Sequence, residues 1–199
     1  MTIDTLMKQV APPVEASGAF DGPWAPVEAE IGLVLPTDYK DYVKLYGAGR
    51  FLEFLGLYIP RAENPNMRLE RMVRVVCEGL TSLSPLEEPP YPYWPTPGGL
   101  LPFGATDNGD ELFWLTRGAA EDWKVVIMDR AFGRFETFDC GVAEFLAGLI
   151  RGEIEPEGFP DDLLPSDCPC MPSAAQAGSA EPRWAMKCST SWRADWRRW

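Results

Sequence analysis

The sequence predicts an α+β fold in which an antiparallel meander sheet packs with several helices in a single domain. Between residues 100 and 139, short apolar runs alternate with turn-forming segments, a pattern typical of strands joined by hairpins. Other segments repeat apolar residues every three or four positions, which indicates amphipathic helices. With 199 residues, of which 46% are apolar and 12% aromatic, the chain is long enough for one such core and too short for two.

Two helices are predicted in the first fifty residues. A short helix spans residues 2–10 and ends before Pro12. A well-marked amphipathic helix begins near Pro36 and stops at Gly47. Its apolar face consists of Leu35, Tyr39, Tyr42, Val43 and Tyr46.

A strand and a long helix are predicted next. Residues 51–59 read as one strand with a bulge at Gly56, closed by Pro60. The helix that follows is capped by Asn64 or Asn66. Its apolar face contains Leu69, Met72, Val73, Val76, Cys77 and Leu80, so Cys77 is expected to be a buried apolar group and not a reactive thiol.

Residues 84–99 contain six prolines and are predicted to form an extended loop. Tyr91, Tyr93 and Trp94 within it are expected to pin the loop onto its own domain, and a recognition surface is the alternative.

The meander itself is predicted to start with residues 100–103. Three further strands are expected at residues 111–116, 123–129 and 134–138. Asp139 is predicted to cap a final helix that stops at Gly152. The apolar face of that helix consists of Val142, Phe145, Leu146, Leu149 and Ile150.

The chain divides into three parts by composition. Residues 1–19 form an N-terminal helix and linker, residues 20–165 form the domain, and residues 166–199 are expected to be a flexible, basic, Trp-rich tail with no necessary role. The tail holds five basic and three acidic residues, so its charge is +2 and that of the preceding 165 residues is −14.

The net charge of −12, with a pI near 4.5, argues against direct binding of nucleic acid and favours a basic protein partner. Solubility alone is the simpler explanation of this charge. No stretch approaches eighteen apolar residues, and residues 1–10 lack the features of a signal peptide. The protein is therefore expected to be cytoplasmic, without membrane contact.

The chain contains no histidine, which excludes His-dependent triads and typical catalytic zinc sites. We therefore expect no enzyme activity, no cofactor and no metal. Five unevenly spaced cysteines do not form a disulfide framework. Cys168, Cys170 and Cys188 make a weak metal site, because a fourth ligand is lacking.

Two segments resemble the SMI1/KNR4 (SUKH) family. The first reads GLVLPTDYKDY at residues 32–42 and continues to YGAG at residues 46–49, as in the opening helix of that family. The second reads LLPFGATDNGD at residues 100–110, and the later strands and closing helix follow in the family's order. The resemblance covers roughly residues 20 to 155.

This resemblance implies a SUKH-like single domain that is not catalytic and has no family-wide catalytic residue. It implies an immunity protein that neutralises a cognate secreted bacterial toxin, in some cases a nuclease, by occluding it. A regulatory scaffold that binds other cellular proteins is the alternative. A third hypothesis, a hydrolase that uses Asp107 and Asp110, needs two carboxylates across a cleft.

Seven residues around the second predicted strand of the meander are candidates for partner binding. The acidic turns at its two ends would steer a basic toxin, and an exposed tryptophan or tyrosine would anchor it, with one of the two tryptophans in the core. The candidates are Asp107, Asp110, Glu111, Trp114, Glu121, Asp122 and Trp123. Asp107, Asp110 and Glu111 also suit a metal or acid/base cluster, although Asp-Asn-Gly-Asp is equally good hairpin chemistry.

Overall fold

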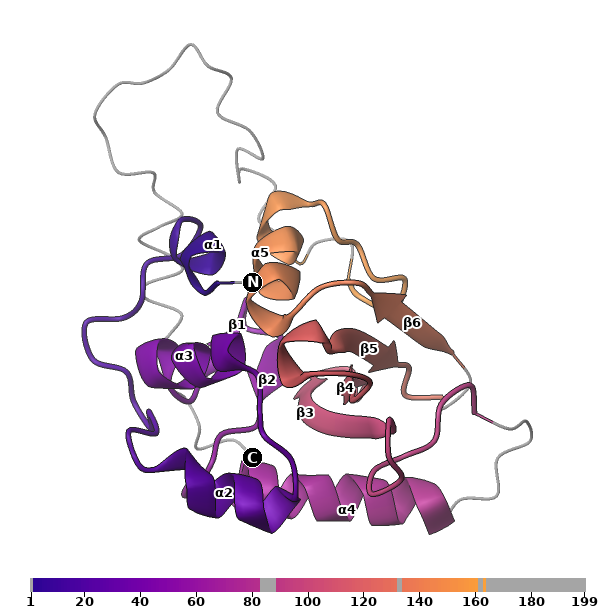
Figure 1. Cartoon of the computed structure of the whole chain (residues 1–199). Coiled ribbons are helices and arrows are strands. Elements are labelled where there is room, and N and C mark those ends of the chain that lie inside the picture. Colours follow the sequence, from indigo (N-terminus) through magenta and orange to yellow (C-terminus); the bar gives the residue numbers. More distant parts are fainter. Residues whose placement is uncertain (1, 83–88, 132–133, 161–162, 164–199) are drawn as a thin grey trace.

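The computed structural model describes residues 2–82, 89–131, 134–160 and 163, and within them it has the predicted α+β class (Figure 1). The helices are α1 (Asp4–Met7), α2 (Trp24–Ile31), α3 (Thr37–Tyr46), α4 (Leu69–Ser82) and α5 (Val142–Arg151). The strands are β1 (Arg50–Phe51), β2 (Leu55–Leu57), β3 (Leu100–Thr106), β4 (Glu111–Leu115), β5 (Lys124–Met128) and β6 (Phe135–Phe138). A short 3-10 turn, η1 (Ala120–Asp122), precedes β5. The tail predicted for residues 166–199, with its three cysteines, lies outside the described residues.

The six strands form one sheet in the order β1-β2-β3-β4-β5-β6, and every neighbouring pair is antiparallel. The predicted meander is therefore confirmed. At its centre, Trp114 on β4 lies opposite Leu101 on β3 and Val125 on β5. The register shifts once, between Pro102 and Gly104.

The single strand predicted for residues 51–59 is wrong, because the chain turns back on itself there. Leu52 (φ 55°) and Glu53 (φ 57°) adopt left-handed backbone conformations and join β1 to β2 as a tight hairpin. Gly56 lies inside β2 and forms no bulge. Such turns usually contain Asn or Gly, and neither stands at these two positions, so no turn residue marked this hairpin.

Helix α2 was not predicted from the sequence. Pro23 precedes it and Pro26 lies in its first turn, where a missing N–H costs nothing. Val27 and Ile31, one turn apart, are buried. Two prolines at the start of a short helix resemble a loop when read from the sequence.

Both faces of the sheet are covered. One face contributes Trp114 and its neighbours to the main core, which includes residues from all five helices. Trp114 makes an edge-to-face contact with Tyr39 of α3 at 4.9 Å between ring centroids. Phe113 and Val126 face the other way and pack with Leu80 of α4.

Tyr91 and Tyr93 pack against this second face. The expectation that aromatic residues pin the proline-rich loop onto the domain is therefore confirmed for its described part.

The start of α5 is not capped as predicted. The N-cap position is Gly141, and the Asp38 carboxylate of α3 accepts a hydrogen bond from the Ala143 N–H at 3.0 Å. Asp139 forms an ion pair with Lys124 instead. The cap comes from a residue about a hundred positions earlier, which no local pattern indicates.

The start of α4 also differs from the prediction. The Asn64 side chain accepts a hydrogen bond from the Asn66 N–H at 2.9 Å, in the turn that precedes the helix. Neither asparagine caps α4, which begins at Leu69.

Candidate functional site

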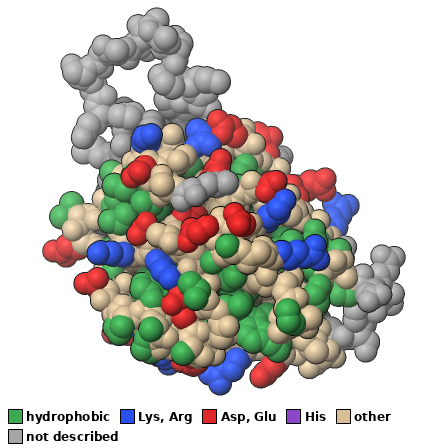
Figure 2. Space-filling model, viewed as in Figure 1, with side chains coloured by type: hydrophobic (Ala, Val, Ile, Leu, Met, Phe, Trp, Pro, Cys, Tyr) green, Lys and Arg blue, Asp and Glu red, His purple; other side chains and the backbone are tan. Residues whose placement is uncertain are grey.

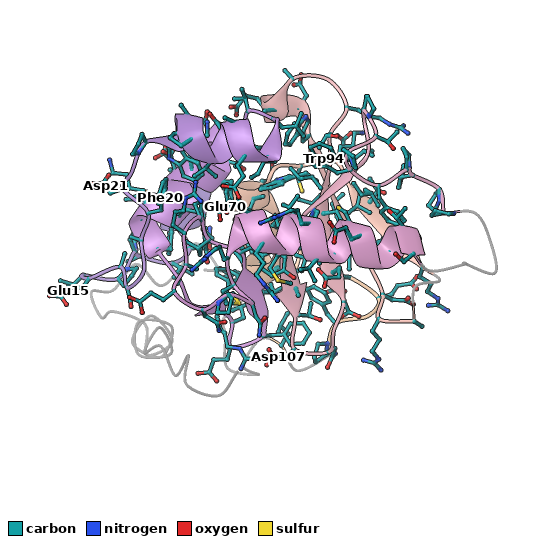
Figure 3. The ribbon with its side chains drawn as sticks, turned by 90° about the horizontal axis from the view of Figure 1, so that it is seen from below. Glu15, Phe20, Asp21, Glu70, Trp94 and Asp107 are labelled. Carbon is teal, nitrogen blue, oxygen red and sulfur yellow. The ribbon has the colours of Figure 1, made fainter. Side chains whose placement is uncertain are left out.

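A groove of about 650 Å³ runs between α2, α4 and the loop that carries Trp94 and Pro95. Its volume lies within the range of sites that bind small molecules or partner side chains. Seen from below, Glu70 of α4 and Trp94 of the loop lie on the same side of this helix (Figure 3). We call this feature the α2–α4 groove, and its lining residues are Glu30, Ile31, Glu70, Val73, Arg74, Cys77, Glu78, Thr81, Ser82, Trp94 and Pro95.

One side of the groove is formed by the end of α2 and by Trp94. Gly32 ends α2 with φ 81°, a conformation that glycine adopts without strain, and the chain turns away there. A side chain at Gly32 would contact the Trp94 ring, at 3.6 Å from its Cβ. The loop holds Trp94 through hydrogen bonds between its backbone N–H and the Leu100 carbonyl (3.0 Å), and between the Leu100 N–H and the Pro92 carbonyl (2.8 Å).

The other side of the groove is one face of α4. Val73 and Cys77 form an apolar floor one turn apart, and they are 7% and 6% exposed. Arg74, Glu78 and Thr81 follow the same spacing along the rim and are exposed. The groove therefore has an apolar base and a polar rim.

Arg61 joins α2 to α4 beside the groove. Its guanidinium lies 3.0 Å from the Glu30 carboxylate and 3.1 Å from the Glu70 carboxylate, and its backbone N–H donates to Glu70 at 3.3 Å. Arg61 itself has φ 56°, which is uncommon outside glycine. Glu70 is 2% exposed, so the ion pair balances a buried charge.

The titratable side chains of the groove differ in how far they are engaged within the domain. Burial raises the pKa of the Cys77 thiol to about 12, so this thiol is not a nucleophile at neutral pH. Glu30 and Glu70 are held by Arg61, whereas Glu78 has no ion pair within the described chain. The buried indole N–H of Trp94 also lacks a hydrogen-bond partner among the described residues.

The first acidic turn predicted to bind a partner is largely engaged within the domain. Asp107 is exposed but forms an ion pair with Arg50. Asp110 is 3% exposed, and its carboxylate accepts hydrogen bonds from the Thr106 hydroxyl at 2.7 Å and the Arg130 N–H at 3.2 Å. Asp110 thus closes the hairpin, and the expectation that it lies on a binding rim is wrong.

Glu111 and the second acidic turn lie at opposite ends of β4, so the structure does not bring them together. Glu111 is half-buried and accepts a hydrogen bond from the Tyr58 hydroxyl at 3.0 Å. Glu121 is exposed and accepts hydrogen bonds from the N–H and hydroxyl of Thr37, at 3.0 and 2.7 Å. It therefore satisfies the first turn of α3, while the exposed Asp122 forms no ion pair with the described residues.

Neither predicted tryptophan is exposed, so the expectation that one of them faces outward is wrong. Trp114 is 0% and Trp123 5% exposed, and their ring centroids lie 6.0 Å apart. With Glu121 they line a recess of about 10 Å³, which is room for roughly one water molecule and not for a partner side chain.

The sequence contained part of the signal for the groove. It shows polar residues at helical spacing beside the apolar face of α4, and a recognition surface that includes Trp94 is one of the two roles it allows for the proline-rich loop. The groove could not be assembled without α2, which the prolines concealed.

In the described ranges, no three His, Cys, Asp or Glu side chains come together as a metal site. None of the helices described has the length and apolar character that crossing a bilayer requires.

Comparison with protein families gives a match over residues 21–146 to SUKH_6, described as SMI1-KNR4 cell-wall. Searches of curated proteins and of solved structures gave no match. The family match spans more than half of the chain and includes α2, α3, α4, the whole sheet and the start of α5. The protein therefore belongs to the SMI1/KNR4 (SUKH) family.

Proposed function

We propose that this chain is a non-catalytic immunity protein, which neutralises a cognate secreted bacterial toxin by covering its active surface. The observation that carries the proposal is the family match, because SUKH proteins are often immunity proteins. The absence of histidine from the sequence agrees with inhibition by binding, which needs no chemistry from the inhibitor.

The charge of the chain suits a basic toxin. A net charge of −12 attracts a cationic surface and raises the rate of encounter, while well-packed apolar contacts slow dissociation. Acidic side chains, interspersed with basic ones, are spread over the face seen in Figure 2. Asp107, Glu121 and Asp122 are exposed and can contribute to this steering, whereas Asp110 is buried and Glu111 is half-buried.

We assign the α2–α4 groove as the anchoring surface. An apolar side chain of the toxin would displace water from Ile31, Val73 and Trp94, and a cationic neighbour would lie against Glu78 on the rim. Interfaces of this kind combine a buried apolar centre with a polar edge.

The second candidate function is a regulatory scaffold for cellular proteins, which the cell-wall description of the matching family favours. A toxin gene immediately upstream would favour immunity, and its absence would favour the scaffold. An acid hydrolase is disfavoured, because Asp110 accepts hydrogen bonds within its own hairpin and Asp107 is paired with Arg50.

The test is co-expression of the upstream toxin candidate with wild-type protein and with three variants. Glu78→Lys with Thr81→Lys changes the groove rim, Glu121→Lys with Asp122→Lys changes the second acidic turn, and Glu15→Lys is the control at an exposed site far from Trp94 (Figure 3). We expect wild type and control to protect cells, the groove variant to lose protection, and the turn variant to associate more slowly at low salt. A wild-type protein that neither protects nor binds the toxin contradicts the immunity proposal. Full protection by the groove variant removes the groove from it.

A further inference from the structure

The end of the sequence differs sharply from the domain that precedes it. Residues 184–199 hold four of the eight tryptophans of the chain, with four basic residues and one acidic residue. The first 165 residues carry a charge of −14. A basic, tryptophan-rich segment is thus covalently attached to an acidic domain.

The α2–α4 groove is complementary to this segment. Its floor is apolar, at Ile31, Val73 and Cys77, and its volume of about 650 Å³ is ample for indole rings. Its rim carries the exposed Glu30, Arg74 and Glu78. Glu30 also pairs with Arg61 at 3.0 Å and with Arg74 at 3.9 Å, whereas Glu78 forms no ion pair within the described residues. Indole rings suit the floor, and arginine or lysine side chains suit the rim.

The spacing of the tryptophans also matches the mode of binding that grooves between helices use. Trp192, Trp196 and Trp199 follow one another at intervals of four and three residues. Segments that dock in helical grooves present their anchors at such intervals. Arg193, Arg197 and Arg198 occupy positions between and beside them.

The connection is long enough to reach. Twenty residues, 164–183, separate the last described residue from Trp184. A chain of that length spans at most about 65 Å, whereas a domain of this size has a diameter of about 40 Å. Every part of the domain surface lies within reach of the segment.

We propose that residues 184–199 bind in the α2–α4 groove of their own chain, with tryptophans on the apolar floor and cationic side chains against Glu30 and Glu78. A partner that uses the groove must then displace this segment, which makes it a built-in competitor. That consequence rests on the proposed function, but binding of the segment does not, and its test needs no toxin.

Lys187 provides the test, because a carbodiimide couples a lysine amine to a carboxylate that it contacts. The full-length chain is treated at low salt, and the linked peptides are identified by mass spectrometry. We expect links from Lys187 to Glu30 or Glu78 in the monomer. Glu15 and Asp21 are internal controls, because both are exposed and lie far from Trp94 (Figure 3).

Two changes separate the proposed contacts from random collisions. Replacing Trp192, Trp196 and Trp199 together by Ser should lower the yield of these links about tenfold, since apolar anchors carry most of such binding. Raising the salt to about 0.5 M should lower it about twofold to fivefold. The proposal is overturned if Lys187 links to Glu15 and Asp21 as readily as to Glu30 and Glu78. Links found only between two chains, or an unchanged yield in the Ser variant, also overturn it, and none of these results bears on toxin neutralisation.

Discussion

Glu111 is a half-buried carboxyl group whose pKa is raised toward neutral pH. Burial raises its pKa from 4.5 to about 7, and the hydrogen bond from the Tyr58 hydroxyl opposes this shift only in part. In the unfolded chain the same group ionises at its ordinary pKa. Between these two values the folded protein binds a proton that the unfolded chain releases, so stability falls as pH rises.

Glu111→Gln should therefore stabilise the protein at pH 8 but not at pH 4. The contribution of Glu111 is fully present below pH 4.5 and is lost as pH rises through about 7, with a change on the order of 3 kcal/mol. Urea unfolding of wild type and variant at several pH values measures the difference. The exposed Glu63→Gln is the control. A difference that is equal at pH 4 and pH 8 would show that folding does not raise the pKa of Glu111.

The residue-level predictions failed where both faces of a strand are buried. Trp114 and Phe113 point to opposite faces of β4, yet each is 0% exposed, because α4 and the proline-rich loop cover the second face. Alternation along a strand identifies an outward side chain only if one face meets water. The burial of Asp110 was missed for a related reason: its carboxylate accepts a hydrogen bond from the Thr106 hydroxyl, which a sequence does not place.

At the scale of elements, Asp38 joins α3 to α5. Its carboxylate accepts hydrogen bonds from the N–H of Tyr39 at 2.7 Å and of Ala143 at 3.0 Å, which satisfies one of the free donors at the start of α5. Burial raises the pKa of Asp38, and these two hydrogen bonds oppose the shift. Gly141 allows the contact, because a Cβ there would lie 2.6 Å from the carboxylate.

Asp38→Ala should lower the free energy of unfolding by about 1–3 kcal/mol, because two N–H donors lose their buried acceptor. Asp38→Asn should cost less, since its amide oxygen still accepts a hydrogen bond. Gly141→Ala should also destabilise the protein, by pushing the carboxylate away from Ala143. Thermal unfolding measures all three variants. If Asp38→Ala unfolds at the wild-type temperature, the two helices are held by packing alone.

Helices and strands with a long, regular apolar pattern could be predicted from the sequence. Those that contain residues unusual for their conformation could not. The periodicity of α3, α4 and α5 placed these helices, and the turn residues placed β4, β5 and β6. The sequence missed α2 because of its prolines, and the β1–β2 hairpin because Leu52 and Glu53 adopt conformations that their side chains disfavour. The groove depends on α2, so its prediction failed together with that helix.

For the whole molecule, the N-terminal helix is part of the main core. Leu6 is fully buried, Ile3 and Val10 join the same cluster, and the Tyr46 hydroxyl donates a hydrogen bond to the Val10 carbonyl at 2.7 Å. From the sequence, residues 1–19 are predicted to be a helix and a linker that precede the domain. In the structure α1 packs against α5, so the two ends of the described chain stabilise each other.

Truncation after Pro165 should leave a cooperatively folded domain, because the residues before that point already form a core that covers both faces of the sheet. Binding of residues 184–199 at a surface groove adds contacts without completing the core. We expect the unfolding midpoint to fall by less than about 4 °C, which corresponds to about 1 kcal/mol in a chain of this length. Deletion of residues 1–10 is the matched comparison, since it removes buried Leu6 and Val10 and should lower the midpoint further. Calorimetry of both truncated chains measures these changes. A larger loss after removal of the tail than after removal of residues 1–10 would mean that residues 166–199 belong to the core.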